Sequence, residues 1–218
     1  MLITVITPTT GKKSLGRLID SIDSQSKARV FHLLLWDDKR DSDVNPESFN
    51  SASRHSIVAP NGSGRNQDAP GSILRAAGLM LARTPWVTFA DDDVWWDNNH
   101  LDEIELLMNS CNWLSVLRRI YKPPNCELIG IDRFESVGDD ICRKVPYEMC
   151  DGNTMAFKRE FGVGAAYLFR ETVEYNDDRL LYGLLKQHAG PRGKTNQASI
   201  NQICPDKLIN FFLSNCDK

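Results

Sequence analysis

Long apolar segments are missing from this sequence, since no run approaches the roughly 20 residues needed to cross a bilayer. No positively charged and then apolar leader precedes the first apolar stretch. Positive charge is not in excess either, because 26 Lys and Arg stand against 29 Asp and Glu, a net charge of -3. A broad basic face for nucleic acid is therefore not expected. We expect a cytoplasmic protein with no transmembrane segment and no nucleic-acid partner, although it could still lie at the periphery of a membrane.

Paired cysteine motifs are also missing. The six cysteines are Cys111, Cys126, Cys142, Cys150, Cys204 and Cys216. They contain no CxxC pair and no Cys/His spacing typical of a zinc site. Without a secretion signal, reduced thiols are a better interpretation than a disulfide framework.

Glycine-rich phosphate loops are a further absence. Residues 11–14 (GKKS) resemble the tail of a P-loop, but Ile6 stands where the first glycine is needed, and Lys13 separates the motif's lysine from its serine. Gly62 and Gly64 lack the third glycine of a dinucleotide-binding fingerprint. Both nucleotide-binding motifs are thus excluded, and the two lysines are interpreted as solvent-exposed residues at the start of a helix.

The most informative segment that is present covers residues 86–97 (WVTFADDDVWWD). Its apolar start has the length and composition of a buried strand, and it ends in the three carboxylates Asp91, Asp92 and Asp93. Adjacent carboxylates beside tryptophans repel one another and lose solvation, so a neutralising cation is expected. A divalent metal with oxygen ligands, shared with a substrate phosphate, fits this demand. The alternative is a solvated acidic turn before a helix that begins near Asn98.

Strand and helix patterns alternate over the first hundred residues. The expected strands cover residues 2–7, 30–36, 56–59 and 86–90, and the expected helices cover residues 15–22 and 71–82. Such alternation predicts an α/β fold with a mostly parallel central sheet flanked by helices.

The pattern changes after residue 100. We expect a helix over 101–108, an antiparallel hairpin or edge pair over 113–121 and 127–131, an extended segment over 152–158, a helix from 177, a glycine- and polar-rich loop over 190–199 and a last helix over 208–213. The polar region 132–148 is expected to be a loop over the site.

The order of these motifs resembles the GT-A-fold nucleotide-sugar glycosyltransferases, family 2-like. The matching segments are LITVITPTT, HLLLWDD, SILRAAGLMLA, VTFADDDVWW, GNTMAFKRE and NDDRLLYGLLKQHAG. The resemblance covers nearly the whole chain. It implies one GT-A-like (Rossmann-like) domain over 1–218, with a nucleotide-sugar-binding half over 1–100, an acceptor-binding half over 101–218 and a small antiparallel extension on the acceptor side.

The resemblance also implies a nucleotide pocket. One of Asp37 and Asp38 would bind the base, where a carboxylate suits the N3 proton of uracil or thymine, and Arg75 would help to hold the nucleotide. The residues that would line the rest of this pocket are Pro8, Thr9 and Thr10.

Asp91 and Asp93 match the DxD signature that holds Mn2+ or Mg2+ against the diphosphate. Asp92, which would otherwise contact the nucleotide, could replace either of them. A metal held by two carboxylates would stabilise the charge of the leaving diphosphate.

Asp178 matches the general base of inverting members, and Asp177 beside it leaves this match uncertain by one position. The acceptor hydroxyl is a poor nucleophile, so a carboxylate should take its proton during attack. His188 and the following loop, with Arg192 and Lys194, fall where some members close over the donor phosphate. The alternative for His188 is the end of a helix.

Trp95 and Trp96 could stack on an acceptor sugar, although packing in the core or at its rim is the alternative. The expected function is therefore metal-dependent transfer of a sugar from a nucleotide-diphospho-sugar, UDP-linked for preference, to a glycan, lipid-linked or protein acceptor, with inversion. Two alternatives remain, a sugar nucleotidyltransferase and a catalytically silent nucleotide-sugar-binding domain.

Overall fold

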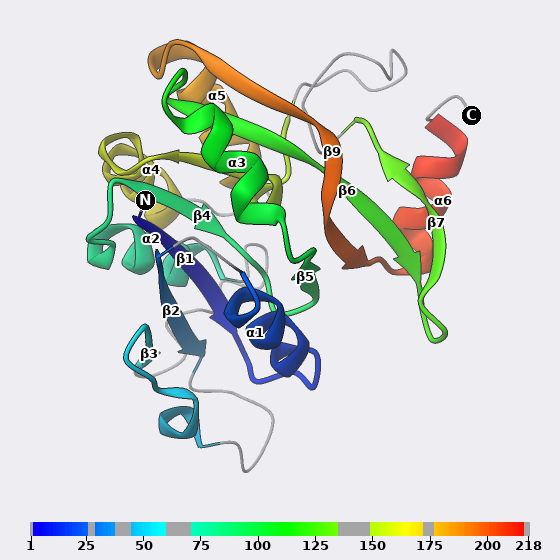
Figure 1. Cartoon of the computed structure of the whole chain (residues 1–218), viewed down its shortest axis with the longest axis horizontal. Coiled ribbons are helices and arrows are strands. Elements are labelled where there is room, and N and C mark those ends of the chain that lie inside the picture. Colours follow the sequence, from blue (N-terminus) through cyan, green and yellow to red (C-terminus); the bar gives the residue numbers. More distant parts are fainter. Residues whose placement is uncertain are drawn as a thin grey trace.

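The computed structural model describes residues 2–25, 29–37, 45–59, 71–134, 149–171 and 177–215 (Figure 1). The strands are β1 (Leu2–Thr9), β2 (Arg29–Asp37), β3 (Arg54–Ala59), β4 (Trp86–Phe89), β5 (Val94–Trp96), β6 (Trp113–Lys122), β7 (Glu127–Asp132), β8 (Met155–Lys158) and β9 (Arg192–Ile203). The helices are α1 (Leu15–Asp23), α2 (Ser72–Leu81), α3 (His100–Met108), α4 (Arg159–Glu171), α5 (Asp177–His188) and α6 (Asp206–Asn215). Short 3-10 turns cover Pro46–Phe49 and Gly152–Thr154.

One sheet runs through the described chain in the order β3-β2-β1-β4-β8-β6-β9-β5, with β7 paired to β6. The strands β3, β2, β1 and β4 are parallel, as the sequence predicted. Antiparallel pairs join β4 to β8, β8 to β6, β6 to β7 and β5 to β9, whereas β6 and β9 run parallel. The α/β architecture is confirmed, and the antiparallel part lies in the second half of the chain.

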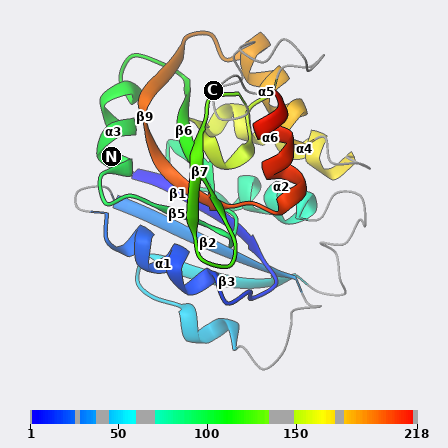
Figure 2. The same cartoon turned by 90° about the vertical axis from the view of Figure 1, so that its right-hand side faces the viewer.

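Helices cover both faces of the sheet, so there are two apolar cores (Figure 2). The apolar faces of α1 and α3 pack with β1, β5 and β6 in one core. Helices α2, α4 and α5 form the other core with β1, β2, β4 and β8. None of the helices in the described part of the chain is long and apolar enough to cross a membrane.

Helix α2 lies unusually close to the sheet at Gly78. A Cβ built on this residue would lie 2.4 Å from Ile6 Cγ2 and 3.0 Å from Leu35 Cδ1. Only glycine allows this approach, which brings the helix start next to the end of β1.

The predicted loop over 190–199 is wrong, because most of that segment belongs to the long strand β9. Its polar residues stay in the sheet because their hydrogen bonds are satisfied there: Ser199 Oγ lies 2.8 Å from His100 Nδ1, and Asn201 Nδ2 donates to Asp97 Oδ1 at 2.9 Å. The hairpin of β6 and β7 is confirmed, but β6 is no edge strand, since β8 and β9 also pair with it.

Candidate active site

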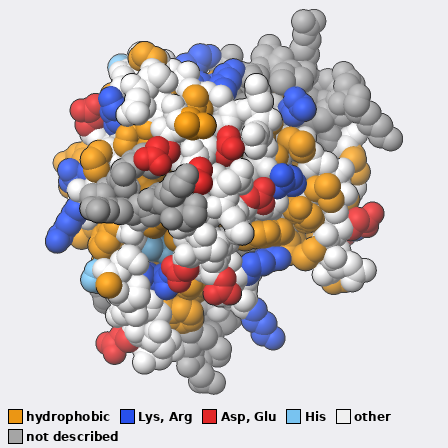
Figure 3. All heavy atoms as spheres, in the orientation of Figure 1, with side chains coloured by type: hydrophobic (Ala, Val, Ile, Leu, Met, Phe, Trp, Pro, Cys, Tyr) orange, Lys and Arg blue, Asp and Glu red, His pale blue; other side chains and the backbone are white. Residues whose placement is uncertain are grey.

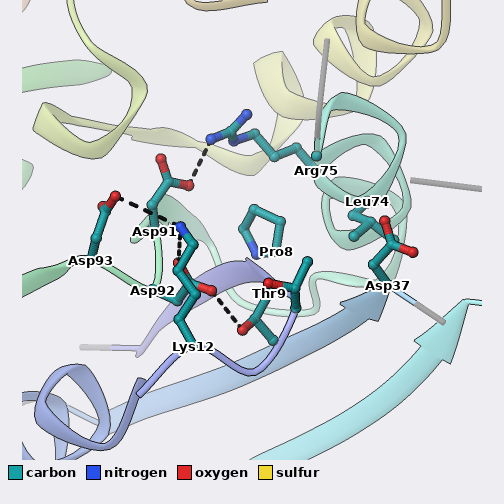
Figure 4. Close-up of a pocket in the computed structure, with 11 residues that line it drawn as sticks. Pro8, Thr9, Lys12, Asp37, Leu74, Arg75, Asp91, Asp92 and Asp93 are labelled. Carbon is teal, nitrogen blue, oxygen red and sulfur yellow. Dashed lines mark hydrogen bonds and ion pairs between the residues drawn. The ribbon is translucent and has the colours of Figure 1, made fainter. Parts of the chain in front are cut away.

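A cavity of about 260 Å³ lies at the carboxyl edge of the parallel strands (Figure 4). Parallel strands end at the same edge, so the segments after β1, β2 and β4 meet there. Eight residues expected in the site line the cavity, together with Lys12, Gly71 and Leu74. The eight are Pro8, Thr9, Thr10, Asp37, Arg75, Asp91, Asp92 and Asp93. Asp38 lies outside the described residues.

Arg75 connects the two acidic segments that the sequence singled out. Its Nη2 donates to Asp91 Oδ1 at 2.6 Å and its Nη1 donates to Asp177 Oδ2 at 2.8 Å. Ser72 Oγ also donates to Asp177 Oδ2, at 3.0 Å. The Arg75 side chain is only 12% exposed, so these ion pairs are shielded from solvent. Asp177 and Asp178 do not line the cavity themselves, but Arg75 joins the start of α5 to it.

Asp91 is also held from the other side by Asn153. The Asn153 amide accepts a hydrogen bond from the Asp91 backbone N-H at 2.6 Å and donates to Asp91 Oδ2 at 3.0 Å. Asn153 in turn donates to Asp151 Oδ1 at 2.9 Å, and fully buried Arg118 forms an ion pair with Asp151. Sequence reasoning missed Asn153 as a site residue, although it lies in the segment GNTMAFKRE.

Asp92 turns toward the loop between β1 and α1. It is 3% exposed, accepts a hydrogen bond from Thr9 Oγ1 at 2.8 Å and lies 2.9 Å from Lys12 Nζ. Lys12 is solvent-exposed just before α1, as the sequence predicted, but its ammonium group also forms an ion pair with Asp92, which the sequence did not predict. Gly11 has a φ of +85°, and the turn that it makes brings Lys12 back over the carboxylates.

Asp93 is the least compensated carboxylate of the three. Its Oδ1 is buried and has no hydrogen-bond partner among the described residues. Burial, and then the charge of Asp91, raise the pKa of Asp93 to about 6. An oxygen ligand that lacks a partner, opposite a second carboxylate, suits a hard divalent cation. The described residues contain no group of three or more side chains that could hold a metal ion, so the assignment of a metal to Asp91 and Asp93 stays a prediction.

Asp178 lies beside the backbone of Gly152, where a Cβ on that glycine would be 2.6 Å from Asp178 Oδ1. Its carboxylate makes no hydrogen bond with the described residues, unlike that of Asp177. Burial, followed by the charges of Asp151 and Asp177, raises the pKa of Asp178 well above its ordinary value. The two neighbouring carboxylates thus differ, because Asp177 accepts hydrogen bonds from Ser72 and Arg75, whereas burial and neighbouring negative charges raise the pKa of Asp178.

The two tryptophans have different surroundings. Trp96 is 2% exposed and its ring centroid lies 4.4 Å from that of His100, so it packs in the core as the alternative interpretation held. Trp95 lies between Arg17, at 3.8 Å from the ring centroid, and Tyr121, at 5.1 Å between ring centroids.

His188 and Arg192 are not at the cavity. His188 is exposed in the last turn of α5, about 16 Å along the helix from Asp177 at 1.5 Å per residue. Arg192, in β9, donates to Ser115 Oγ at 2.6 Å. The position of His188 therefore favours the end of a helix, the alternative that the sequence left open. Lys194, expected in the same loop, also belongs to β9.

Neither a family model nor a curated protein matches this sequence. Solved structures of S. aureus TarS do match. Its residues 1–349 superpose with a TM-score of 0.66 at 14% identity, over 100% of this chain and 67% of that chain. The complex of that segment with UDP-GlcNAc superposes with a TM-score of 0.65 at 13% identity, over 94% of this chain and 59% of that chain. A further S. aureus TarS structure superposes with a TM-score of 0.64 at 15% identity, over 100% of this chain and 40% of that chain. This chain thus spans two thirds or less of those chains. Sequence identity this low supports an assignment of the fold alone. The fold is the GT-A-like α/β fold.

Proposed function

We propose that this chain is a metal-dependent glycosyltransferase that moves a sugar from a UDP-linked donor to an acceptor hydroxyl, with inversion and with Asp178 as the base. The observation that carries the proposal is the link through Arg75, which joins the carboxylates after β4 to the start of α5. Such a transfer needs both acidic groups at one site, one to hold the donor and one to take a proton.

The donor end of the site rests on Asp91, Asp93 and Asp37. Mn2+ or Mg2+ held by Asp91 and Asp93 would act as a Lewis acid toward the diphosphate leaving group. Arg75 donates to Asp91 from one side and Asn153 donates to it from the other, so the orientation of this carboxylate at the cavity is fixed. Asp37 is buried at the end of β2 and lines the cavity, where its carboxylate would accept a hydrogen bond from the N3-H of uracil. The complexes of TarS with UDP and UDP-GlcNAc support a UDP-linked donor for this chain too.

Asp178 is the better base of the two carboxylates at the start of α5. A raised pKa makes an ionised carboxylate a stronger proton acceptor, provided that it is deprotonated at the working pH. Asp177 is a poorer candidate because Arg75 and Ser72 already donate to it. The acceptor proton would pass to Asp178 as the hydroxyl attacks the anomeric carbon, and a single in-line displacement inverts that centre. Acceptors of this kind include hydroxyls of a glycan, a lipid-linked sugar or a protein.

The test is calorimetric titration with UDP, GDP, dTDP and CDP, each in Mn2+ and in chelator. We expect one nucleotide, UDP, to bind at micromolar concentration only with metal. Asp93→Ala should abolish this metal-dependent binding, whereas Asp20→Ala, at an exposed position in α1, controls for the loss of one negative charge. Unchanged UDP affinity in Asp93→Ala would remove the metal assignment. Failure of all four nucleotides to bind the folded protein would contradict the transferase itself.

A further inference from the structure

Lys12 lies over the carboxylates that follow β4, with its ammonium group directed at Asp92 and Asp93 (Figure 4). Its Nζ is 2.9 Å from Asp92 Oδ1 and 3.8 Å from Asp93 Oδ2. The ammonium group therefore lies on the same carboxylate edge that a divalent cation would approach, at the wall of the same cavity.

The backbone fixes where Lys12 starts. Thr9 Oγ1 donates to Asp92 Oδ2 at 2.8 Å and accepts from the Gly11 N-H at 2.9 Å, which ties the loop to the carboxylates. The Leu15 N-H donates to the Lys12 carbonyl at 3.0 Å as α1 begins. The main chain at Lys12 is thus held on both sides, while its side chain is 54% exposed.

The three carboxylates differ in how they are neutralised. Asp91 forms an ion pair with Arg75 at 2.6 Å, and Asp92 forms one with Lys12 at 2.9 Å. The ion pair of Asp93 with Lys12 is longer, at 3.8 Å. A cation beside Asp93 would meet both an unsatisfied oxygen and, close by, the positive charge of Lys12. Like charges at such separations repel even in a hydrated site.

We propose that Lys12 is a built-in counter-cation that competes with the divalent metal for the carboxylate edge, so that metal binds weakly until the nucleotide diphosphate is present. This inference rests on the metal-dependent function proposed above. Before ligands arrive, Lys12 holds Asp92 and shields Asp93. Metal entry displaces the ammonium group, and the negative charge of the diphosphate offsets the repulsion that remains. Metal and nucleotide consequently bind with positive coupling, and by linkage each raises the affinity of the other by the same factor.

The experiment is a titration of the intact protein with Mn2+ in the absence of nucleotide. Binding is measured by electron paramagnetic resonance, as the loss of the signal of free Mn2+. Lys12→Met should bind Mn2+ about tenfold more tightly than the wild type, which corresponds to about 1.4 kcal/mol. Lys13→Met removes a neighbouring exposed charge that does not line the cavity, and Lys12→Arg keeps the charge. The gain in Mn2+ affinity should be smaller in each of these two variants than in Lys12→Met. With saturating UDP the difference between Lys12→Met and the wild type should shrink.

The other outcomes distinguish competition by Lys12 from the metal-dependent function proposed above. If Lys12→Met binds Mn2+ with wild-type or lower affinity while UDP binding stays metal-dependent, competition by Lys12 is refuted and the proposed function stands. If Lys13→Met gains as much as Lys12→Met, the effect is one of net charge, and the role of Lys12 is again refuted. If no protein binds Mn2+ with or without UDP, both this inference and the metal dependence of the proposed function are overturned.

Discussion

Replacement of Arg75 by methionine tests the central link of the site. Methionine keeps much of the length of the side chain but removes the guanidinium that donates to Asp91 and Asp177. Both carboxylates would then lie in a poorly solvated region without their cation. The expected result is a loss of stability together with loss of nucleotide binding.

The magnitude follows from the burial of the three side chains. Arg75 is 12%, Asp177 11% and Asp91 26% exposed, so the pairs are largely removed from water. Removing one partner of a buried ion pair costs about 3–5 kcal/mol, and the partial exposure of Asp91 favours the lower half, about 3–4 kcal/mol. For a chain of this length that corresponds to a fall in Tm of about 6–16 °C.

Urea unfolding of wild type and Arg75→Met under the same conditions measures this cost. Arg83→Met, at an exposed arginine just after α2, is the matched control and should cost less than about 0.5 kcal/mol. In the double variant Arg75→Met/Asp177→Asn, the loss beyond that of Arg75→Met should be small, since the amide at position 177 carries no charge and only Asp91 remains without its cation. A cost below about 1 kcal/mol for Arg75→Met would refute the reasoning, because the pairs would then behave as exposed ones.

Three further predictions concern the base, the pH dependence and the packing. Asp178→Asn should leave UDP affinity intact and lower the transfer rate by about 10²–10⁴-fold; if Asp177→Asn alone does this, the base is one position earlier. His32 is buried, and burial is the main cause that lowers its pKa to about 3. As the pH falls below about 6.5, His32 is protonated in the unfolded chain but stays neutral in the folded protein, so the free energy of unfolding decreases. His32→Gln should therefore flatten the acid side of the stability curve by about 1.4 kcal/mol per pH unit between pH 6 and 4, and an unchanged slope in urea unfolding would contradict this. Gly78→Ala should destabilise the protein by about 1–3 kcal/mol through overpacking, while Gly16→Ala, where a Cβ meets nothing within 4 Å, should not; equal thermal shifts would argue against the close approach.

The edge of the sheet at which the cavity forms could be predicted from strand periodicity. Parallel strands expose their carboxyl ends at one edge, so the segments after 2–7, 30–36 and 86–90 had to meet. Asp37 and Asp91 accordingly line one cavity although 54 positions separate them in the chain. The helix over 72–81 was equally predictable, because its apolar residues repeat at helical spacing.

Periodicity failed where tertiary hydrogen bonds replaced apolar burial. Strand β9 is polar enough to resemble a loop, but the sheet buries Thr195, Ser199 and Asn201, and partners in other elements bond the last two. Lys12 is exposed before a helix, as the sequence predicted, but its ion pair with Asp92 depends on the turn at Gly11 and could not be read from the sequence.

The sequence by itself determined the α/β order of elements, the edge at which the site forms and the residue types that meet there. It could not determine how the charges pair, because pairing depends on distances between segments far apart in the chain. Asp177 and Asp178 are the same residue type at adjacent positions, so no sequence pattern separates their roles. On a helix, adjacent side chains point about 100° apart, given 3.6 residues per turn. One of them therefore meets Arg75 and Ser72, and the other lies against Gly152 without a hydrogen-bond partner among the described residues.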